Sequence, residues 1–154
     1  ISTRWPFFYM TLSFAFLGIQ QAVLDFTGTY LRGNNSDQER RDQPQKQHGW
    51  GQLVLAHEQS QALTYRVISE AGVDPTEEQV HRAWAAMVTA MDTAPSMASL
   101  ALRVCGGRAL LRPAPLERIY RDARCGATML PWSEEVCLDR LGKSGLYDDE
   151  DTSA

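Results

Sequence analysis

The segment from Pro6 to Leu31 limits the fold of this chain more than any other feature of the sequence. It is largely apolar and aromatic, and it contains no internal breaker beyond isolated glycines such as Gly18. It lacks the alternation of apolar and polar residues that marks a strand, and it is too long for one. The segment therefore predicts a long, mostly buried helix, which the run Gly33-Asn34-Asn35-Ser36 ends.

The next part of the chain predicts a loop and then a second helix. Residues 37–47 are charged and rich in glutamine, and they include a proline, which predicts a loop. Residues 50–70 predict a helix that ends before Gly72. Its expected inward stripe, at helical spacing, consists of Leu53, Ala56, Gln59, Leu63 and Val67.

A third helix is predicted from Pro75 to about Val104. Asp74 is the expected N-cap, because Pro75 then occupies the first helical position, where a proline is well tolerated. Alanine and methionine dominate the centre of the segment, as in a helix that packs closely on its neighbours. Pro95 lies inside it and predicts a kink or a split near Thr93.

Two shorter helices are predicted in the last third of the chain. The glycine pair Gly106-Gly107 ends the third helix, and residues 115–124 form a fourth. A last helix starts after Ser133, which is a good N-cap. Glu134 and Glu135 then lie in its first turn, where the helix dipole favours negative charge.

The sequence has no strand pattern and no internal repeat, so we expect an all-α protein. Its long helices and short turns predict an up-and-down domain that resembles a four-helix bundle, with two short terminal helices. We assign residues 1–142 to this domain and predict that the acidic, polar tail 143–154 is disordered.

Length, charge and hydropathy exclude several classes of function. The chain has 154 residues, which is enough for one domain with a sizeable core. Its net charge of −4 argues against nucleic acid as a partner. The apolar run from Trp5 to Ile19 covers about 15 residues, fewer than the roughly 20 that cross a membrane, so we expect no membrane partner.

The cysteines and histidines do not predict a metal site. Cys105, Cys125 and Cys137 are odd in number and form no CxxC pair, so neither a disulfide scaffold nor a zinc site is expected, and a reducing cytoplasm is the simplest compartment. His57 and Glu58 begin like a zinc-protease motif, but Gln61 stands where the second histidine should be.

Three stretches, taken together and in order, give the chain a resemblance to a known family. They are "FLGIQQAVLDFTGTYL", "LALRVCGGRALL" and "LERIYRDAR". Over about residues 4–142 the sequence resembles the C-terminal helical domain of the flavin-dependent acyl-CoA dehydrogenases. The resemblance implies an FAD-dependent oxidoreductase that dehydrogenates an acyl thioester, carried by CoA or by a carrier protein. It also implies a homo- or hetero-oligomer of family subunits.

The resemblance assigns cofactor contact to Gly106, Gly107 and Trp132. Glycines suit such a role because a backbone without Cβ atoms can approach a flat ligand or a phosphate closely. On the residues alone, the pair also reads as a simple helix C-cap. In the same way Arg118, Arg121 and Arg124, with Asp122 between them, read as a solvated helix face, while the resemblance implies that they support the site and a subunit interface.

The carboxylate that removes the α-proton in this family has no counterpart here. The resemblance aligns the family's Glu-Gly-Thr turn with Leu130, Pro131 and Trp132, and the alternative position of the base with Phe8. Glu134 and Glu135 follow within a turn or so, but helix N-terminal charge explains them better. The family's Arg-x-x-Phe-Gly is also unmatched, since Arg32 stands nearby without a Phe-Gly. The catalytic residues are therefore unknown.

Three functional hypotheses remain open at this stage. The chain belongs to a dehydrogenase-like subunit that acts with a partner carrying the base, to a flavin-dependent monooxygenase of the same fold, or to a helical scaffold that has lost its chemistry. Bound flavin after purification separates the last hypothesis from the first two, and an enoyl product from a saturated thioester separates the first from the second.

Overall fold

The computed structural model describes residues 5–33, 38–112, 114–128 and 134–147. Within them all regular structure is helical, and no strand is present. The α-helices are α1 (Trp5–Arg32), α2 (Gln38–Arg41), α3 (Pro44–Ser69), α4 (Glu77–Cys105), α5 (Pro115–Ala123) and α6 (Glu134–Leu146). Two 3₁₀ helices, η1 (Gly107–Leu110) and η2 (Arg124–Thr128), flank α5.

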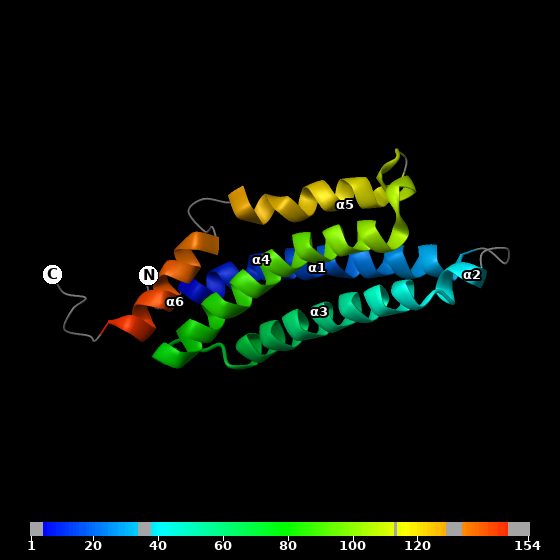
Figure 1. Ribbon diagram of the computed structural model, residues 1–154. Helices are drawn as coiled ribbons and strands as arrows, with labels where there is room; N and C mark the ends of the chain where they lie inside the picture. The colour runs from blue at the N-terminus through cyan, green and yellow to red at the C-terminus, as the bar shows by residue number, and fades with distance from the viewer. Residues whose placement is uncertain (1–4, 34–37, 113, 129–133, 148–154) are drawn as a thin grey trace.

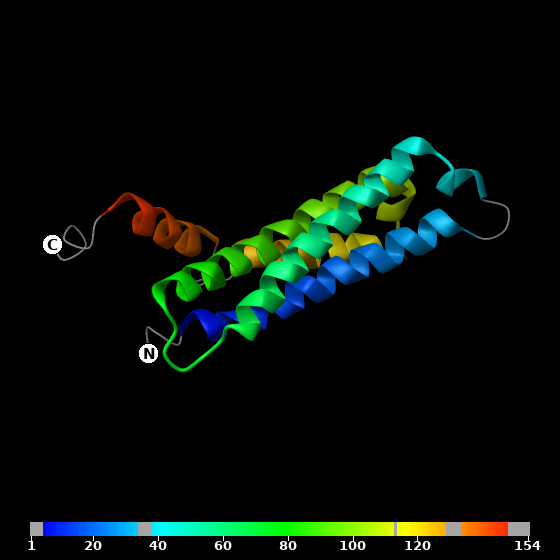
Figure 2. The same cartoon turned by 90° about the horizontal axis from the view of Figure 1, so that it is seen from below.

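The long helices α1, α3 and α4 form an up-and-down bundle, and α5 completes it (Figure 1). The shorter α5 lies along α1 and α4, on the side away from α3 (Figure 1). Helix α6 packs on α4 at the end of the bundle where α1 begins, and it points away from the other helices in the second view (Figure 2). The prediction of an all-α, four-helix-bundle-like domain is confirmed.

Helix α4 forms the centre of the bundle because its inward face is made of small residues. Six alanines spaced along it are at most 1% exposed, and they let the axes of α1 and α3 approach closely. Flexible methionine side chains fill the remaining gaps. These residues are Ala83, Ala86, Ala90, Ala94, Ala98 and Ala101, with Met87, Met91 and Met97.

A buried polar layer joins the three long helices at mid-height. The Gln20 side-chain amide on α1 donates to the Ser60 hydroxyl and to the Ala90 carbonyl, both at 3.0 Å. Because a carbonyl only accepts, the orientation of the Gln20 amide is determined, and its oxygen accepts from Nδ1 of His57 at 3.2 Å. The layer thereby specifies both the register of the helices and the tautomer of the imidazole.

The predicted loop at 37–47 is wrong in part. Helix α2 occupies Gln38–Arg41, and α3 already begins at Pro44, six residues before the predicted start at Trp50. Pro44 takes the first turn of α3, where its missing N–H has no helical partner to lose. Glutamine, lysine and arginine are good helix formers, so a charged, glutamine-rich composition suits a helix as well as a loop.

The inward stripe predicted for this helix is also wrong in part. Leu53 and Val67 are buried as expected, but Gln59 is exposed. The buried line instead runs through polar residues: His57 and Thr64 are 5% and 0% exposed. A stripe chosen by hydrophobicity missed them because both are polar, yet their polar atoms have partners: His57 contacts Gln20 on α1, and the Thr64 hydroxyl donates to the Ser60 carbonyl within α3.

Thr76, and not the predicted Asp74, caps α4. Its hydroxyl accepts from the backbone N–H of Gln79, whose side chain in turn accepts from the backbone N–H of Thr76. This reciprocal capping box satisfies two helix-start donors at once. Helix α4 then runs unbroken through Pro95, so the predicted split near Thr93 is absent; packing against α1 and α3 holds the helix together where local propensity would end it.

The predicted fourth helix matches α5 to within one residue. The predicted cap of the last helix, Ser133, lies outside the described residues, but Glu134 and Glu135 are in the first turn of α6 as expected. Helix α6 continues to Leu146, into the segment assigned to the tail, and residues 148–154 lie outside the described part.

Candidate functional site

The glycine pair lies at a sharp corner at the end of α4. The backbone N–H of Gly106 donates to the Leu102 carbonyl at 2.8 Å, which closes the last turn of the helix. Gly106 has φ 88° and ψ 171°, a region that is essentially restricted to glycine. The chain then enters η1, whose Ala109 is buried and donates its backbone N–H to the Gly106 carbonyl at 3.0 Å.

The two glycines differ in what the protein itself requires of them. A Cβ atom added to either would meet no described atom within 4 Å. Gly106 is needed for its positive φ, whereas Gly107 is exposed and has an ordinary φ. No packing contact within the described chain therefore explains Gly107, and its backbone is open to a group outside this chain.

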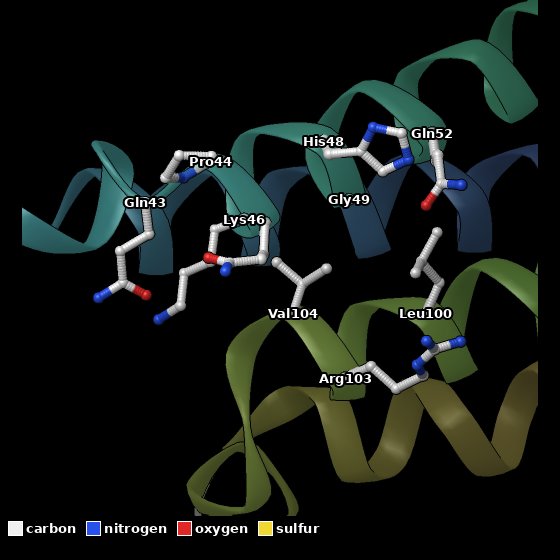
Figure 3. A pocket seen from close by; sticks show the side chains of 10 residues that line it. Gln43, Pro44, Lys46, His48, Gly49, Gln52, Leu100, Arg103 and Val104 are labelled. Atoms are coloured by element: carbon white, nitrogen blue, oxygen red, sulfur yellow. The ribbon is translucent and has the colours of Figure 1, made fainter.

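An open groove of about 680 Å³ lies beside this corner, where the start of α3 crosses the end of α4 (Figure 3). Gly49 makes the crossing close, because a Cβ there would overlap the Val104 side chain. Figure 3 shows the α3 side chains above and the α4 side chains below. The lining residues are Gln43, Pro44, Gln45, Lys46, His48, Gly49, Gln52, Leu100, Arg103 and Val104.

The groove is suited to a negatively charged ligand. Lys46 and Arg103 supply positive charge, and no carboxylate is among the lining residues. Pro44 marks the start of α3, whose first backbone N–H groups and dipole favour an anion at this end. The sequence did not predict this groove, because Lys46 and His48 precede the predicted start of the helix at Trp50. Pro44, a residue typical of a first helical turn, is the signal that could have revealed the earlier start.

The other positions singled out by the sequence lie elsewhere or outside the described residues. Leu130, Pro131 and Trp132 fall outside them, so the predicted cofactor contact of Trp132 stays a prediction. Phe8 is in the first turns of α1, but its side chain is not among those described. Arg32, in the last turn of α1, is exposed.

Glu134 is not part of the glycine corner. Burial, then the charges of Asp92 and Glu135, raise the pKa of the Glu134 carboxyl above its ordinary value. Asp92 and Gly106 are 14 positions apart in the sequence, which corresponds to about 21 Å along a helix. Within the described chain, Glu134 of α6 and Asp92 of α4 therefore form a separate acidic region, remote from the glycine corner.

The arginines of α5 make local contacts. Arg121 pairs with Glu117 at 2.9 Å, and Arg118 lies 4.0 Å from Asp122, both at i, i+4 spacing on an exposed face. Arg124, the first residue of η2, donates to the Tyr120 hydroxyl at 2.8 Å. Such pairs contribute under about 1 kcal/mol each. The contacts seen here are those of a solvated helix face.

The described residues contain no cluster of three or more histidine, cysteine or carboxylate groups that could hold a metal. His57 is committed to the buried polar layer. Burial raises the pKa of the Cys105 and Cys137 thiols, while Cys125 is exposed. No helix in the described part of the chain is long and apolar enough to span a membrane.

The fold is an all-α bundle whose central helix ends at a glycine corner. Residues 10–130 match the family model "Acyl-CoA dehydrogenase, C-terminal domain". The chain belongs to this family, as the three sequence motifs indicated.

Solved structures of similar fold include a dibenzothiophene monooxygenase, TdsC, from Paenibacillus sp. A11-2, with a TM-score of 0.78 and 20% identity. A complex of TdsC with FMN and indole gives a TM-score of 0.77 and 18% identity. Each alignment covers 92% of this chain and 39% of the other, so the chain spans well under half the length of these proteins. No curated protein sequence matches the chain.

Proposed function

We propose that this chain provides the C-terminal helical domain of a flavin-dependent oxidoreductase, and that its glycine corner and basic groove receive the phosphate-bearing part of the flavin. The proposal rests above all on Gly107, an exposed glycine that no contact in the described chain explains, beside a groove with cationic and no anionic lining. Family membership supports the same assignment.

The cofactor we propose is FAD, with FMN as the competing flavin. The FAD pyrophosphate presents two linked anionic phosphates, whereas FMN presents one, and the groove offers two cations, Lys46 and Arg103, at the start of a helix. FMN is favoured by one observation, its presence in the TdsC complex of similar fold.

The first reaction we propose is α,β-dehydrogenation of an acyl thioester, in which a bound flavin accepts the hydride. Such a reaction also needs a proton acceptor, and the positions that would supply one hold Leu130 and Phe8. The chain would therefore act in an assembly with family subunits, one of which carries the carboxylate. The second candidate is monooxygenation, which needs no such carboxylate and is favoured by the structural similarity to TdsC.

Flavin titration tests the cofactor assignment. We expect the purified protein to bind FAD, and Gly107→Leu to weaken binding at least tenfold, because its side chain would fill the approach to the corner. Gly51→Leu is the matched control, since Gly51 is also exposed and also has no described atom near an added Cβ. Absence of binding to both flavins would leave the scaffold hypothesis, and equal binding by the two variants would remove the corner from the site.

Product analysis tests the reaction. Without a partner, the protein should form no enoyl thioester from a saturated acyl thioester with a dye acceptor. Turnover that is abolished by Glu134→Gln would show that the base is present after all. Oxygen-dependent conversion of an aromatic substrate by the flavin-loaded protein would select the monooxygenase.

A further inference from the structure

The aromatic ring of Tyr30, near the end of α1, is in contact with two cations. The Arg40 guanidinium carbon lies 4.7 Å from the centroid of the Tyr30 ring, and the Lys46 ammonium nitrogen lies 5.9 Å from it. Both distances fall within the range of about 6 Å over which the negative face of a ring attracts a cation. One ring on α1 therefore contacts α2 through Arg40 and the first turn of α3 through Lys46.

The Tyr30 ring is itself fixed by its neighbours. Phe26 precedes it by one helical turn, and the two rings stack with centroids 6.3 Å apart and an interplanar angle of 23°. Both aromatic side chains are half-buried and pack against the core. Lys46 is also half-buried, whereas residues 41–45 and 47–48 on either side of it are exposed. The contact with Tyr30 accounts for the partial burial of this one lysine.

The charge of Lys46 acts at the glycine corner. Its side chain lines the basic groove beside the end of α4 (Figure 3). Burial raises the pKa of the Cys105 thiol, and a contact with Thr27 and the positive charges of Lys46 and Arg40 oppose that rise. Cys105 is the last residue of α4 and directly precedes Gly106. The cations on the Tyr30 ring therefore lie close enough to the corner to stabilise negative charge there.

A lysine held on a fixed ring is better prepared to bind an anion than a lysine that extends into water. The four-carbon stem of a free lysine is flexible, and it loses much of its freedom when the ammonium group binds a phosphate. A ring that already restricts the side chain reduces this entropic loss, which is the general effect of preorganisation. A carboxylate partner would neutralise the lysine, whereas a neutral ring leaves its full positive charge available to the ligand.

We propose that Tyr30 is a positioning residue of the flavin site, whose ring holds the Lys46 ammonium group at the groove for the phosphate-bearing part of the flavin. This inference rests on the proposed function, which assigns Lys46 to that ligand and gives Tyr30 no part. Tyr30 acts through Lys46, because it is not among the residues that line the groove. In the competing explanation, the ring packs on the methylene groups of the lysine and only stabilises the fold.

A double-mutant cycle with FAD titration tests the positioning role. Lys46→Met should raise the FAD dissociation constant about tenfold, because it removes one charge-assisted contact with phosphate. Tyr30→Leu should raise it about two- to fivefold, the ratio expected for a cation–π contact at a partly exposed site. Tyr30→Phe keeps the ring and should stay within about twofold of the unchanged protein. In the Lys46→Met background, Tyr30→Leu should add less than about twofold, because the lysine that the ring holds is gone.

A second measurement needs no flavin. The ring current of Tyr30 shifts the NMR signals of the Lys46 methylene protons, so these signals should move in Tyr30→Leu and stay close to their original positions in Tyr30→Phe. The matched control is Tyr65→Leu, which removes an exposed tyrosine 19 positions from Lys46 on α3, about 28 Å along the helix. It should change neither the lysine signals nor FAD binding. Circular dichroism should show that all the variants are folded.

The outcomes separate this inference from the proposed function. If no flavin binds, or if Lys46→Met leaves FAD binding unchanged, the basic groove is not the flavin site, and the positioning role fails with it. If Lys46→Met weakens binding but Tyr30→Leu does not, the groove assignment stands and the role of Tyr30 is overturned. Equal weakening by Tyr30→Leu with and without Lys46, or weakening with unchanged lysine signals, would show that the ring only stabilises the fold.

Discussion

Replacing Gln20 by leucine should destabilise the bundle more than any other single polar substitution on α1. Gln20 is fully buried and uses both amide hydrogens and its oxygen in contacts with Ser60, Ala90 and His57. Without the Gln20 amide, the His57 N–H has no acceptor and the Ser60 hydroxyl loses its donor. Each buried polar group left unsatisfied costs about 1–3 kcal/mol, and the gain from burying leucine offsets part of this. We expect a net loss of about 2–4 kcal/mol.

A double-mutant cycle tests the physical reason as well as the size. His57→Leu strands the Gln20 oxygen, whereas Gln20→Leu with His57→Leu removes both partners of the bond. The double variant should therefore lose less than the two single losses together, with a coupling of about 1–2 kcal/mol in urea unfolding followed by circular dichroism. Gln21→Leu, an exposed neighbour, should change stability by under about 0.5 kcal/mol. Additive losses at Gln20 and His57 would refute the buried layer.

Other perturbations separate backbone effects from charge effects. Gly106→Ala should lower the free energy of unfolding by about 1–3 kcal/mol, because φ 88° with ψ 171° strains any other residue, while Gly107→Ala should not. Because the pKa of Glu134 is raised in the folded protein, its contribution to the free energy of unfolding is fully present below the ordinary carboxyl pKa and is lost as pH rises. Glutamine is uncharged at every pH, so Glu134→Gln should raise the melting temperature at pH 7 and not at pH 3. Hydrogen bonds from Arg82 lower the pKa of Glu70; stability from this pair is present at pH 7 and lost on acidification, so Glu70→Gln should flatten the acid limb of a melting-temperature profile.

Signals such as helical length and a terminal glycine predicted the helices well where the structure of a segment depends mainly on its own residues. The long apolar stretch after Pro6, which has no proline inside it, forms α1, and Gly106 ends α4 with the positive φ that glycine provides. The start of α4 shows the limit of such signals. Asp74-Pro75 and Thr76-x-x-Gln79 are both good helix starts, and only the backbone geometry of the turn after α3 selects the second.

The sequence predicted the glycine pair of the candidate site but not the basic groove beside it. Gly106 and Gly107 are adjacent in sequence, so a motif can reveal them. Lys46 and Arg103 are far apart in the chain and meet only where α3 crosses α4 at Gly49. No pattern along a single chain encodes that crossing, because it depends on how two helix surfaces fit together.

The sequence by itself determined that the chain is helical, where its main helices run, and that no carboxylate occupies either position of the family base. These properties follow from periodicity, breakers and residue identity, which act over a few turns. Only the tertiary structure decided that His57 is a buried structural residue, that helix α4 survives Pro95, and that a basic groove adjoins the glycine corner. Each of these depends on contacts between helices distant in sequence, and the energy of such contacts can override the preference of any single segment.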